Sequence, residues 1–202
     1  MKKRFVVSML AGALAAMFAI PSVVALKPGA AAPEFTATAS KAGKDFTFSL
    51  KDALKKGPVV VYFYPAAYTG GCDLEAHTFA TEKDKFDAAG ATIIGVSADS
   101  IKRLNDFSSD PDYCAGKFPV ASDADGKIAS SYGLKLIPPQ PGMKDAQGQT
   151  ITHGFIPRTT FVIGSDGKIL SELSSNEDHL KPDEHVAKSL AIVQQMHTAK
   201  AP

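Results

Sequence analysis

Two unbroken apolar runs dominate the pattern of hydrophobic and polar positions along the chain. Residues 59–64 read VVVYFY and residues 91–96 read ATIIGV, and both runs are rich in β-branched or aromatic side chains. An apolar run without alternation is typical of a strand that is covered on both faces. We therefore expect both segments to be central strands of a sheet.

Shorter segments with alternating apolar and polar positions predict the outer strands. Phe35–Ala39 and Phe46–Leu50 flank a Ser-Lys-Ala-Gly-Lys turn, which indicates an N-terminal β-hairpin. Residues 160–163 and 168–173 lie on either side of Ser-Asp-Gly, a strong hairpin signal. Residues 118–121 form one more short strand in this prediction.

A helical stripe begins at the first cysteine. Cys72, Ala76, Phe79 and Phe86 lie at offsets of 0, 4, 7 and 14, close to one face of a helix that extends to about residue 89. The Cys72 thiol is therefore expected to share a face with the core.

The remaining elements complete the prediction of the fold. Helices are expected at about 100–107 and 125–132, and a final helix begins near Pro182, while residues 137–157 are predicted to be an irregular insertion at the rim of the sheet. The final helix is expected to turn these side chains toward the core: Val186, Leu190, Val193 and Met196. This order is typical of an α/β fold of the thioredoxin-like sandwich type, with a central mixed β-sheet flanked by helices and an N-terminal β-hairpin.

The first 25 residues have the features of a secretory signal peptide. A basic stretch, residues 2–4, precedes an apolar run over residues 5–20 that is short for a membrane span. Val23 and Ala25 place small side chains at the two positions that a signal peptidase reads, so cleavage is expected after Ala25, with an uncleaved anchor as the alternative. The expected organisation is a signal peptide over 1–25 and one domain over 26–202, located in a bacterial periplasm.

Charge and motifs exclude several classes of function. The chain has 22 Lys and Arg against 21 Asp and Glu, so its formal net charge of +1 gives no basic field for nucleic acid. It has no glycine-rich nucleotide-binding motif. The histidines show no metal-ligand spacing and are expected mostly at the surface, with His153 near the mouth of a pocket; they are His77, His153, His179, His185 and His197. We expect neither a metal nor an organic cofactor.

The candidate chemistry centres on the two cysteines, Cys72 and Cys114. In a periplasmic protein such a pair is by default a structural disulfide. However, Cys72 follows Gly70 and Gly71 at the start of a helix, where free N–H groups and the helix dipole favour a thiolate. Thr69 can turn its hydroxyl toward the same space.

Pro65, Thr69 and Cys72 form the pattern P-x-x-x-T-x-x-C within VVVYFYPAAYTGGCDLEAHTF. This resembles the active-site signature of the peroxiredoxins, and the nearest branch is the bacterioferritin-comigratory or peroxiredoxin Q type. Three further segments, ATIIGVSADS, FPVASDADGKIASSYGL and RTTFVIGSDGKIL, carry the resemblance through most of the chain.

The resemblance implies a role for each matching residue. Cys72 would be the peroxidatic nucleophile, Thr69 would orient the peroxide, Pro65 would shield the site, Arg158 would stabilise the thiolate, and Glu75 would hold the arginine. Arg158 also directly precedes a predicted strand, where a fixed cation could lower the pKa of a thiol. The reaction would convert a peroxide to an alcohol or water and Cys72 to a sulfenic acid. The family further implies a thioredoxin-like or other thiol reductant and a monomer, with no membrane contact after signal cleavage.

The sequence departs from this family at one position. Many peroxiredoxin Q members have a resolving cysteine five residues after the peroxidatic one, where this chain has His77. Cys114 is the intramolecular alternative, and a one-cysteine enzyme that is reduced by an external thiol is the other.

Two other functions stay open from sequence alone. A thioredoxin-like thiol–disulfide oxidoreductase needs C-x-x-C, but Asp-Leu-Glu follows Cys72. A non-catalytic protein with a Cys72–Cys114 structural disulfide is the second.

Overall fold

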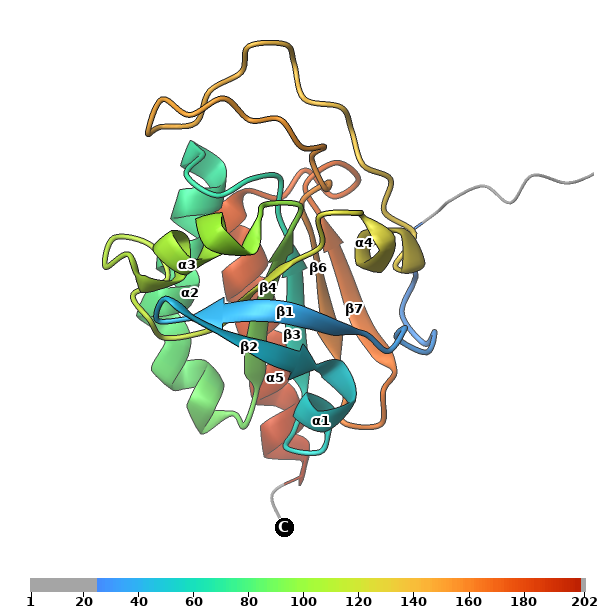
Figure 1. The fold of residues 1–202 in the computed structure, drawn as a ribbon. Helices are drawn as coiled ribbons and strands as arrows, with labels where there is room; N and C mark the ends of the chain where they lie inside the picture. Colours follow the sequence, from blue (N-terminus) through green and yellow to red (C-terminus); the bar gives the residue numbers. More distant parts are fainter. Residues whose placement is uncertain (1–24, 201–202) are drawn as a thin grey trace, which may run out of the picture.

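The computed structural model describes residues 25–200, and within them seven strands form one mixed sheet (Figure 1). The predicted signal peptide therefore lies outside the described residues, apart from Ala25. The strands are β1 (Thr36–Lys41), β2 (Lys44–Ser49), β3 (Val59–Phe63), β4 (Thr92–Ser97), β5 (Val120–Ser122), β6 (Thr159–Ile163) and β7 (Ile169–Ser174). Their order across the sheet is β2-β1-β5-β4-β3-β6-β7.

The two long apolar runs occupy the middle of this sheet, as predicted. β3 pairs in parallel with β4 and antiparallel with β6, and β4 pairs in parallel with β5. Every residue of β3 is buried, which explains why its sequence shows no polar alternation. Both predicted hairpins are confirmed, since β1 pairs antiparallel with β2 and β6 with β7.

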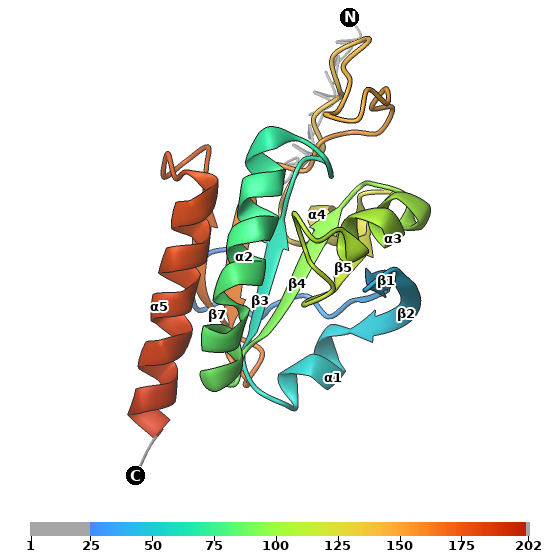
Figure 2. The ribbon, with the colours of Figure 1, turned by 90° about the vertical axis from the view of Figure 1, so that its left-hand side faces the viewer.

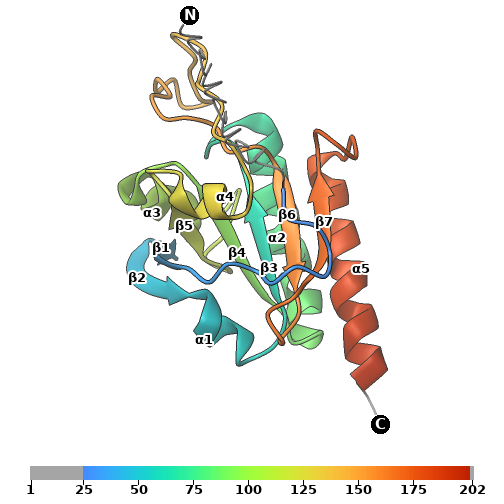
Figure 3. The ribbon, with the colours of Figure 1, turned by 90° about the vertical axis from the view of Figure 1, so that its right-hand side faces the viewer.

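Helices cover both faces of the sheet. They are α1 (Leu50–Leu54), α2 (Gly70–Ala88), α3 (Ile101–Ser109), α4 (Lys127–Ser131) and α5 (Pro182–Lys200). α2, α3 and α5 pack on the hydrophobic cluster of one face, and α2 and α5 run side by side from the same end of the molecule (Figure 2). α1 and α4 pack on the other cluster, where residues 25–35 cross the sheet from β7 toward β1 (Figure 3).

A long segment arches over the end of the sheet at which α2 and α5 begin (Figure 1). We call residues 137–157 the strap. Its base is closed by two backbone hydrogen bonds between Ile137 and Phe155, of 2.8 and 2.7 Å. The strap contains no regular helix or strand, as predicted, but isolated bridges between Ile137 and Phe155 and between Lys144 and Thr150 give it a hairpin-like course.

The structure differs from the predictions in three local details. α1 was not predicted, because five residues are too few to show a helical period; Ser49 caps it by accepting a hydrogen bond from the Asp52 N–H. α2 begins at Gly70, two residues before the predicted start. Met196 is only half-buried, although the other three predicted core residues of α5 are buried. None of the helices in residues 25–200 is long and apolar enough to cross a membrane.

Candidate active site

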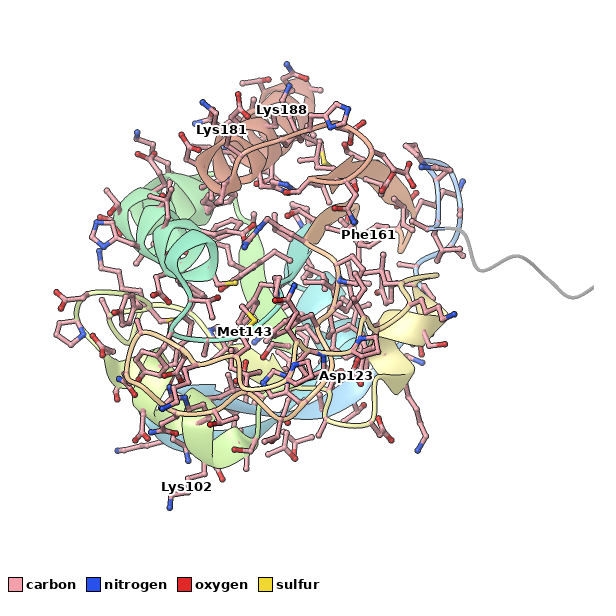
Figure 4. The ribbon with its side chains drawn as sticks, turned by 90° about the horizontal axis from the view of Figure 1, so that it is seen from above. Lys102, Asp123, Met143, Phe161, Lys181 and Lys188 are labelled. Atoms are coloured by element: carbon pink, nitrogen blue, oxygen red, sulfur yellow. The ribbon has the colours of Figure 1, made fainter. Side chains whose placement is uncertain are left out.

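Cys72 lies in the first turn of α2, at the end of the sheet where β3 leads into this helix. Its side chain is 2% exposed, and it belongs to the hydrophobic cluster under α2 and α5. The Cys72 N–H donates to the Thr69 carbonyl at 2.7 Å, so the backbone of Cys72 is fixed within the N-terminal turn. Figure 4 views this end of the molecule from above, with Met143 of the strap near the middle of the view.

Arg158 connects Cys72 to Glu75. It directly precedes β6, and because β6 pairs with β3, its side chain is brought beside the start of α2. Its Nη2 donates to the Cys72 Sγ at 3.2 Å, and its Nη1 donates to the Glu75 carboxylate. Glu75 is fully buried, although a glutamate one turn into a helix is commonly exposed.

Gly71 provides the space that Arg158 occupies. A Cβ atom at this position would lie 3.1 Å from Arg158 Nη2 and 3.5 Å from a ring carbon of Pro182 at the start of α5. The guanidinium therefore lies against the backbone of Gly71, between the first turns of two helices. A Cβ atom here would require the guanidinium to shift by a few tenths of an ångström.

Thr69 is the N-cap residue of α2, and its hydroxyl has a fixed direction. Thr69 Oγ1 donates to the Ala66 carbonyl at 2.7 Å, which commits its single hydrogen. Its lone pairs remain as acceptors for a ligand O–H. Pro65 is half-buried and begins the same loop, so the prediction that Pro65, Thr69 and Cys72 share one short segment at the strand end holds.

Opposing influences act on the Cys72 thiol. Burial is the largest, and it raises the pKa of Cys72 above its ordinary value. The Arg158 cation and a backbone hydrogen bond from Ala66 lower this pKa, and the Thr69 hydroxyl adds to them only when its hydrogen turns from the Ala66 carbonyl to the sulfur. The neighbours are thus arranged to stabilise an anionic sulfur, but in this closed site the balance lies with the thiol. This differs from the sequence-based expectation, which considered the helix end and the cation without the desolvation.

Glu75 and Arg158 form a buried ion pair. Burial raises the pKa of Glu75 to about 7, and the Arg158 charge acts in the opposite direction. Burial also works against the charge on Arg158, but Glu75 and Cys72 outweigh it and raise the pKa of the guanidinium. Arg158 therefore remains a cation, and its charge favours the ionised form of Glu75 against the effect of burial.

Cys114 is fully buried in the turn after α3, in the same hydrophobic cluster as Cys72. The two cysteines are both free thiols in this structure. The turn is held against α2 at two points, because His77 Nδ1 lies 2.9 Å from the Asp112 carbonyl and Lys117 Nζ donates to the Ala80 carbonyl at 2.9 Å. The residue at the position of the usual resolving cysteine, His77, thus contacts the segment that carries Cys114.

One histidine departs from the expectation of surface positions. His185 is fully buried, with Nδ1 3.0 Å from Thr160 Oγ1 and Nε2 2.9 Å from Ser175 Oγ. Ser175 donates its hydrogen to the Leu180 carbonyl, so it accepts from His185 Nε2–H, and burial, which lowers the pKa of His185, favours the neutral imidazole. The prediction was wrong here because a histidine between two hydroxyl groups packs well in a core.

Asp99, the partner of His153, is a support of the site that the sequence analysis missed. His153 Nε2 lies 3.0 Å from Asp99 Oδ1, and Asp99 Oδ2 accepts from the Ala67 N–H at 2.8 Å. Asp99 follows β4, the parallel neighbour of β3, and polar residues at such strand ends meet at one edge of a sheet. That placement was the available signal. His153 and Asp99 line a cavity of about 300 Å³ between the strap and Ala67.

The comparisons with known proteins agree with this geometry. The sequence profile of the AhpC/TSA family matches residues 28–171. The chloroplastic peroxiredoxin Q of Oryza sativa subsp. japonica is 30% identical over 169 residues, which cover 83% of this chain and 67% of the rice protein.

Two solved structures extend the comparison to the fold. Peroxidoxin BcpB from Mycobacterium tuberculosis has a TM-score of 0.68 at 28% identity, over 85% of this chain and 98% of that one. The Xanthomonas campestris bacterioferritin comigratory protein has a TM-score of 0.63 at 26% identity, over 86% and 98%. The thioredoxin-like fold predicted from sequence is therefore confirmed. This chain belongs to the AhpC/TSA family and is a thiol-dependent peroxidase of the peroxiredoxin type.

Proposed function

We propose that Cys72 is the peroxidatic cysteine, with Thr69 and Arg158 as its catalytic partners. The main support for this assignment is the Arg158 guanidinium, which binds the Cys72 sulfur with one terminal nitrogen and the Glu75 carboxylate with the other. A cation fixed in this way can stabilise negative charge on sulfur and on the oxygens of a peroxide. Pro65 borders the loop and limits access of water, and Glu75 positions the arginine.

Reduction of the peroxide by Cys72 needs no cofactor, because the thiol supplies both electrons and the proton. The Cys72 sulfur attacks the terminal oxygen of the peroxide, so an S–O bond forms while the O–O bond breaks. The sulfur supplies two electrons and becomes a sulfenic acid, and the proton that it loses ends on the leaving oxygen, which departs as water or an alcohol. Because the Thr69 hydrogen is committed to Ala66, Thr69 accepts a hydrogen bond from the peroxide O–H and orients it.

The alternative of a thiol–disulfide oxidoreductase has less support. Such an enzyme needs a second cysteine three residues after the first, and that position is Glu75, buried against Arg158. The alternative of a structural disulfide also has less support, since Cys72 and Cys114 are free thiols that belong to different segments.

We propose that Cys114 resolves the sulfenic acid by forming a disulfide with Cys72. Both residues are buried in one cluster, and His77 and Lys117 tie the Cys114 segment to α2. Unwinding of the first turns of α2 would break these ties and release both sulfurs together. A thioredoxin-like or other thiol would then reduce the disulfide; a one-cysteine cycle is the alternative, in which that thiol attacks Cys72 directly.

The substrates and the location are also proposals. The Xanthomonas campestris bacterioferritin comigratory protein has alkyl peroxide reduction activity, which supports organic hydroperoxides beside hydrogen peroxide as substrates of this chain. The N-terminal pattern over residues 1–25 supports export to the periplasm, where the monomeric mature chain would begin at Leu26. Mass spectrometry of a periplasmic extract would find a protein that starts at Leu26, and an intact N-terminus would contradict this proposal.

Peroxide consumption by three proteins tests the assignment. The wild type and the Cys114→Ser variant should consume hydrogen peroxide with a small-molecule dithiol as reductant, whereas the Cys72→Ser variant should not. Equal rates in both variants would contradict the assignment of Cys72. Peptide mapping of peroxide-treated wild type should then find a Cys72–Cys114 bond; a sulfenic or sulfinic Cys72 beside a free Cys114 would support the one-cysteine cycle instead.

A further inference from the structure

Tyr68, the residue before Thr69, has an unusual backbone and an unusual environment. Its φ angle is +60°, a left-handed conformation that is uncommon for an aromatic residue. Such a residue costs about 1 kcal/mol or more and persists only where the surrounding structure imposes it. Its side chain is 1% exposed, so the contacts that impose it are tertiary ones.

Those contacts come from three segments. The Arg103 guanidinium lies over the Tyr68 ring, with its central carbon 4.1 Å from the ring centroid. The rings of Phe107 and Tyr113 stand edge-on to Tyr68 at centroid distances of 5.1 and 5.4 Å. The Tyr68 carbonyl accepts a hydrogen bond of 2.8 Å from the N–H of Ala146 in the strap.

Arg103 joins these segments through both of its terminal nitrogens. Nη2 donates to the Asp145 carboxylate, and Nη1 donates to Gln147 Oε1 at 2.6 Å. The side chains of this ion pair are 13% and 4% exposed, so it is shielded from water. A stacked and bidentate guanidinium cannot be replaced by a lysine without the loss of a contact. Arg103 therefore stacks on the Tyr68 ring and binds the strap at the same time.

We propose that Arg103 is a positioning residue for the peroxide-binding loop: it holds Tyr68 in its left-handed conformation and thereby sets the direction of Thr69 and the first turn of α2. The proposal rests on the function assigned above to Cys72 and Thr69. Release of Tyr68 to an ordinary φ would turn the following residue and open the loop around the buried sulfur. Arg103 touches neither the peroxide nor the sulfur.

Opening of the loop has two effects of opposite sign, which gives the proposal a distinctive test. Reaction of Cys72 with hydrogen peroxide needs the aligned loop, so it should slow. Alkylation by iodoacetamide needs access to a sulfur that is 2% exposed, so it should accelerate. Both rates can be measured on the full chain by mass spectrometry of the Cys72 peptide.

The central variant is Arg103→Met, which removes the charge and both hydrogen bonds. We expect its reaction with peroxide to be about tenfold slower and its alkylation about fivefold faster than in wild type, and the tenfold change corresponds to about 1.4 kcal/mol. Arg103→Lys keeps the charge but can reach only one strap acceptor. Its peroxide and alkylation rates should lie between those of wild type and Arg103→Met. It also keeps the test decisive if the methionine variant folds poorly.

Two controls separate positioning from charge and from general stability. Lys102→Met removes a cation from the same helix, and Lys102 points away from the molecule in Figure 4. Ile169→Ala creates a cavity in the opposite cluster, where Ile169 is 1% exposed. Both controls should keep the two rates within about twofold of wild type.

The outcomes distinguish this proposal from the proposed function. Unchanged rates in Arg103→Met, or a parallel fall of both rates, would overturn the role of Arg103. If wild type does not react with peroxide, the proposed function fails, and the alkylation rate alone then decides whether Arg103 keeps the loop closed.

Discussion

Removal of the Arg158 charge is the most direct test of how the site controls its sulfur. In Arg158→Met, the cation 3.2 Å from the Cys72 sulfur is replaced by an apolar side chain of similar length. A unit charge at about 4 Å interacts with a thiolate by about 4 kcal/mol at an effective dielectric constant of about 20. Loss of Arg158 also removes the charge that lowers the pKa of Glu75, so Glu75 takes up a proton and its repulsion of the thiolate disappears, which reduces the net effect to about 2 kcal/mol.

This energy corresponds to a rise of about 1 to 2 units in the pKa of Cys72. The sign follows from the structure, because Arg158 is the largest influence that lowers the pKa of the thiol, and its removal leaves burial opposed only by weaker hydrogen bonds. Loss of charge stabilisation in the transition state should add to the smaller thiolate fraction, so the rate constant with hydrogen peroxide at pH 7 should fall by about 10³-fold.

The assay is the pH dependence of Cys72 alkylation, read from the Cys72 peptide, together with peroxide kinetics. Lys188→Met is the matched control, because it removes one exposed cation from α5, at the edge of the view in Figure 4. The double variant Glu75→Gln/Arg158→Met leaves no unpaired buried carboxylate. It therefore shows whether the loss of rate persists when the fold is not destabilised by an unpaired charge. A pKa of Cys72 within about 0.3 units of wild type in Arg158→Met would refute the electrostatic role of Arg158.

Three further predictions concern the loop, the helix start and the core. Thr69→Val should slow peroxide reduction about 10²-fold, because it removes the acceptor fixed by Ala66, whereas Thr69→Ser should restore most of the rate in the same peroxide assay. Gly71→Ala should slow it about tenfold with little change in melting temperature, because its Cβ would lie 3.1 Å from Arg158; an unchanged rate would mean that the guanidinium has room to shift. Burial lowers the pKa of His185 to about 4, below the value of about 6.5 in the unfolded chain, so unfolded molecules bind the proton first as the pH falls. The unfolding free energy should therefore drop by about 3 kcal/mol between pH 6.5 and pH 4, and a urea titration series in which His185→Asn shows the same slope would contradict this.

The sequence predicted best what depends on local pattern. β3 and β4 were evident because apolar runs mark strands covered on both sides, and α2 because Cys72, Ala76 and Phe79 share a helical stripe. The strap was recognised by its lack of period. These features need no knowledge of the partner segment.

The candidate site was predicted in part through the family resemblance. That resemblance named Cys72, Thr69 and Arg158, and the pairing of β6 with β3 explains physically why residues so far apart in sequence meet. The burial of Glu75 and its ion pair could not be read from the helix alone, since a single turn does not reveal which side is covered.

Properties that depend on three-dimensional surroundings were not predicted. The raised pKa of Cys72 arises from desolvation by several elements, and sequence reasoning considers charges and helix ends but not exclusion of water. The left-handed φ of Tyr68 carries no local signal either, because tyrosine has no preference for it. His185 was misplaced for the same reason, as its two hydroxyl partners come from other elements.

The position of Cys72 within the hydrophobic cluster links turnover to the integrity of the fold. The proposed oxidation would convert a small apolar contact into a polar group that needs hydrogen-bond partners, at a point where Phe79, Tyr62 and Cys114 belong to the same cluster. Each catalytic cycle would thus lower the free energy of unfolding while Cys72 is oxidised, and reduction by the thiol would restore it. Tighter packing around this sulfur would raise the melting temperature of the reduced protein. The same change would slow the reduction of oxidised Cys72.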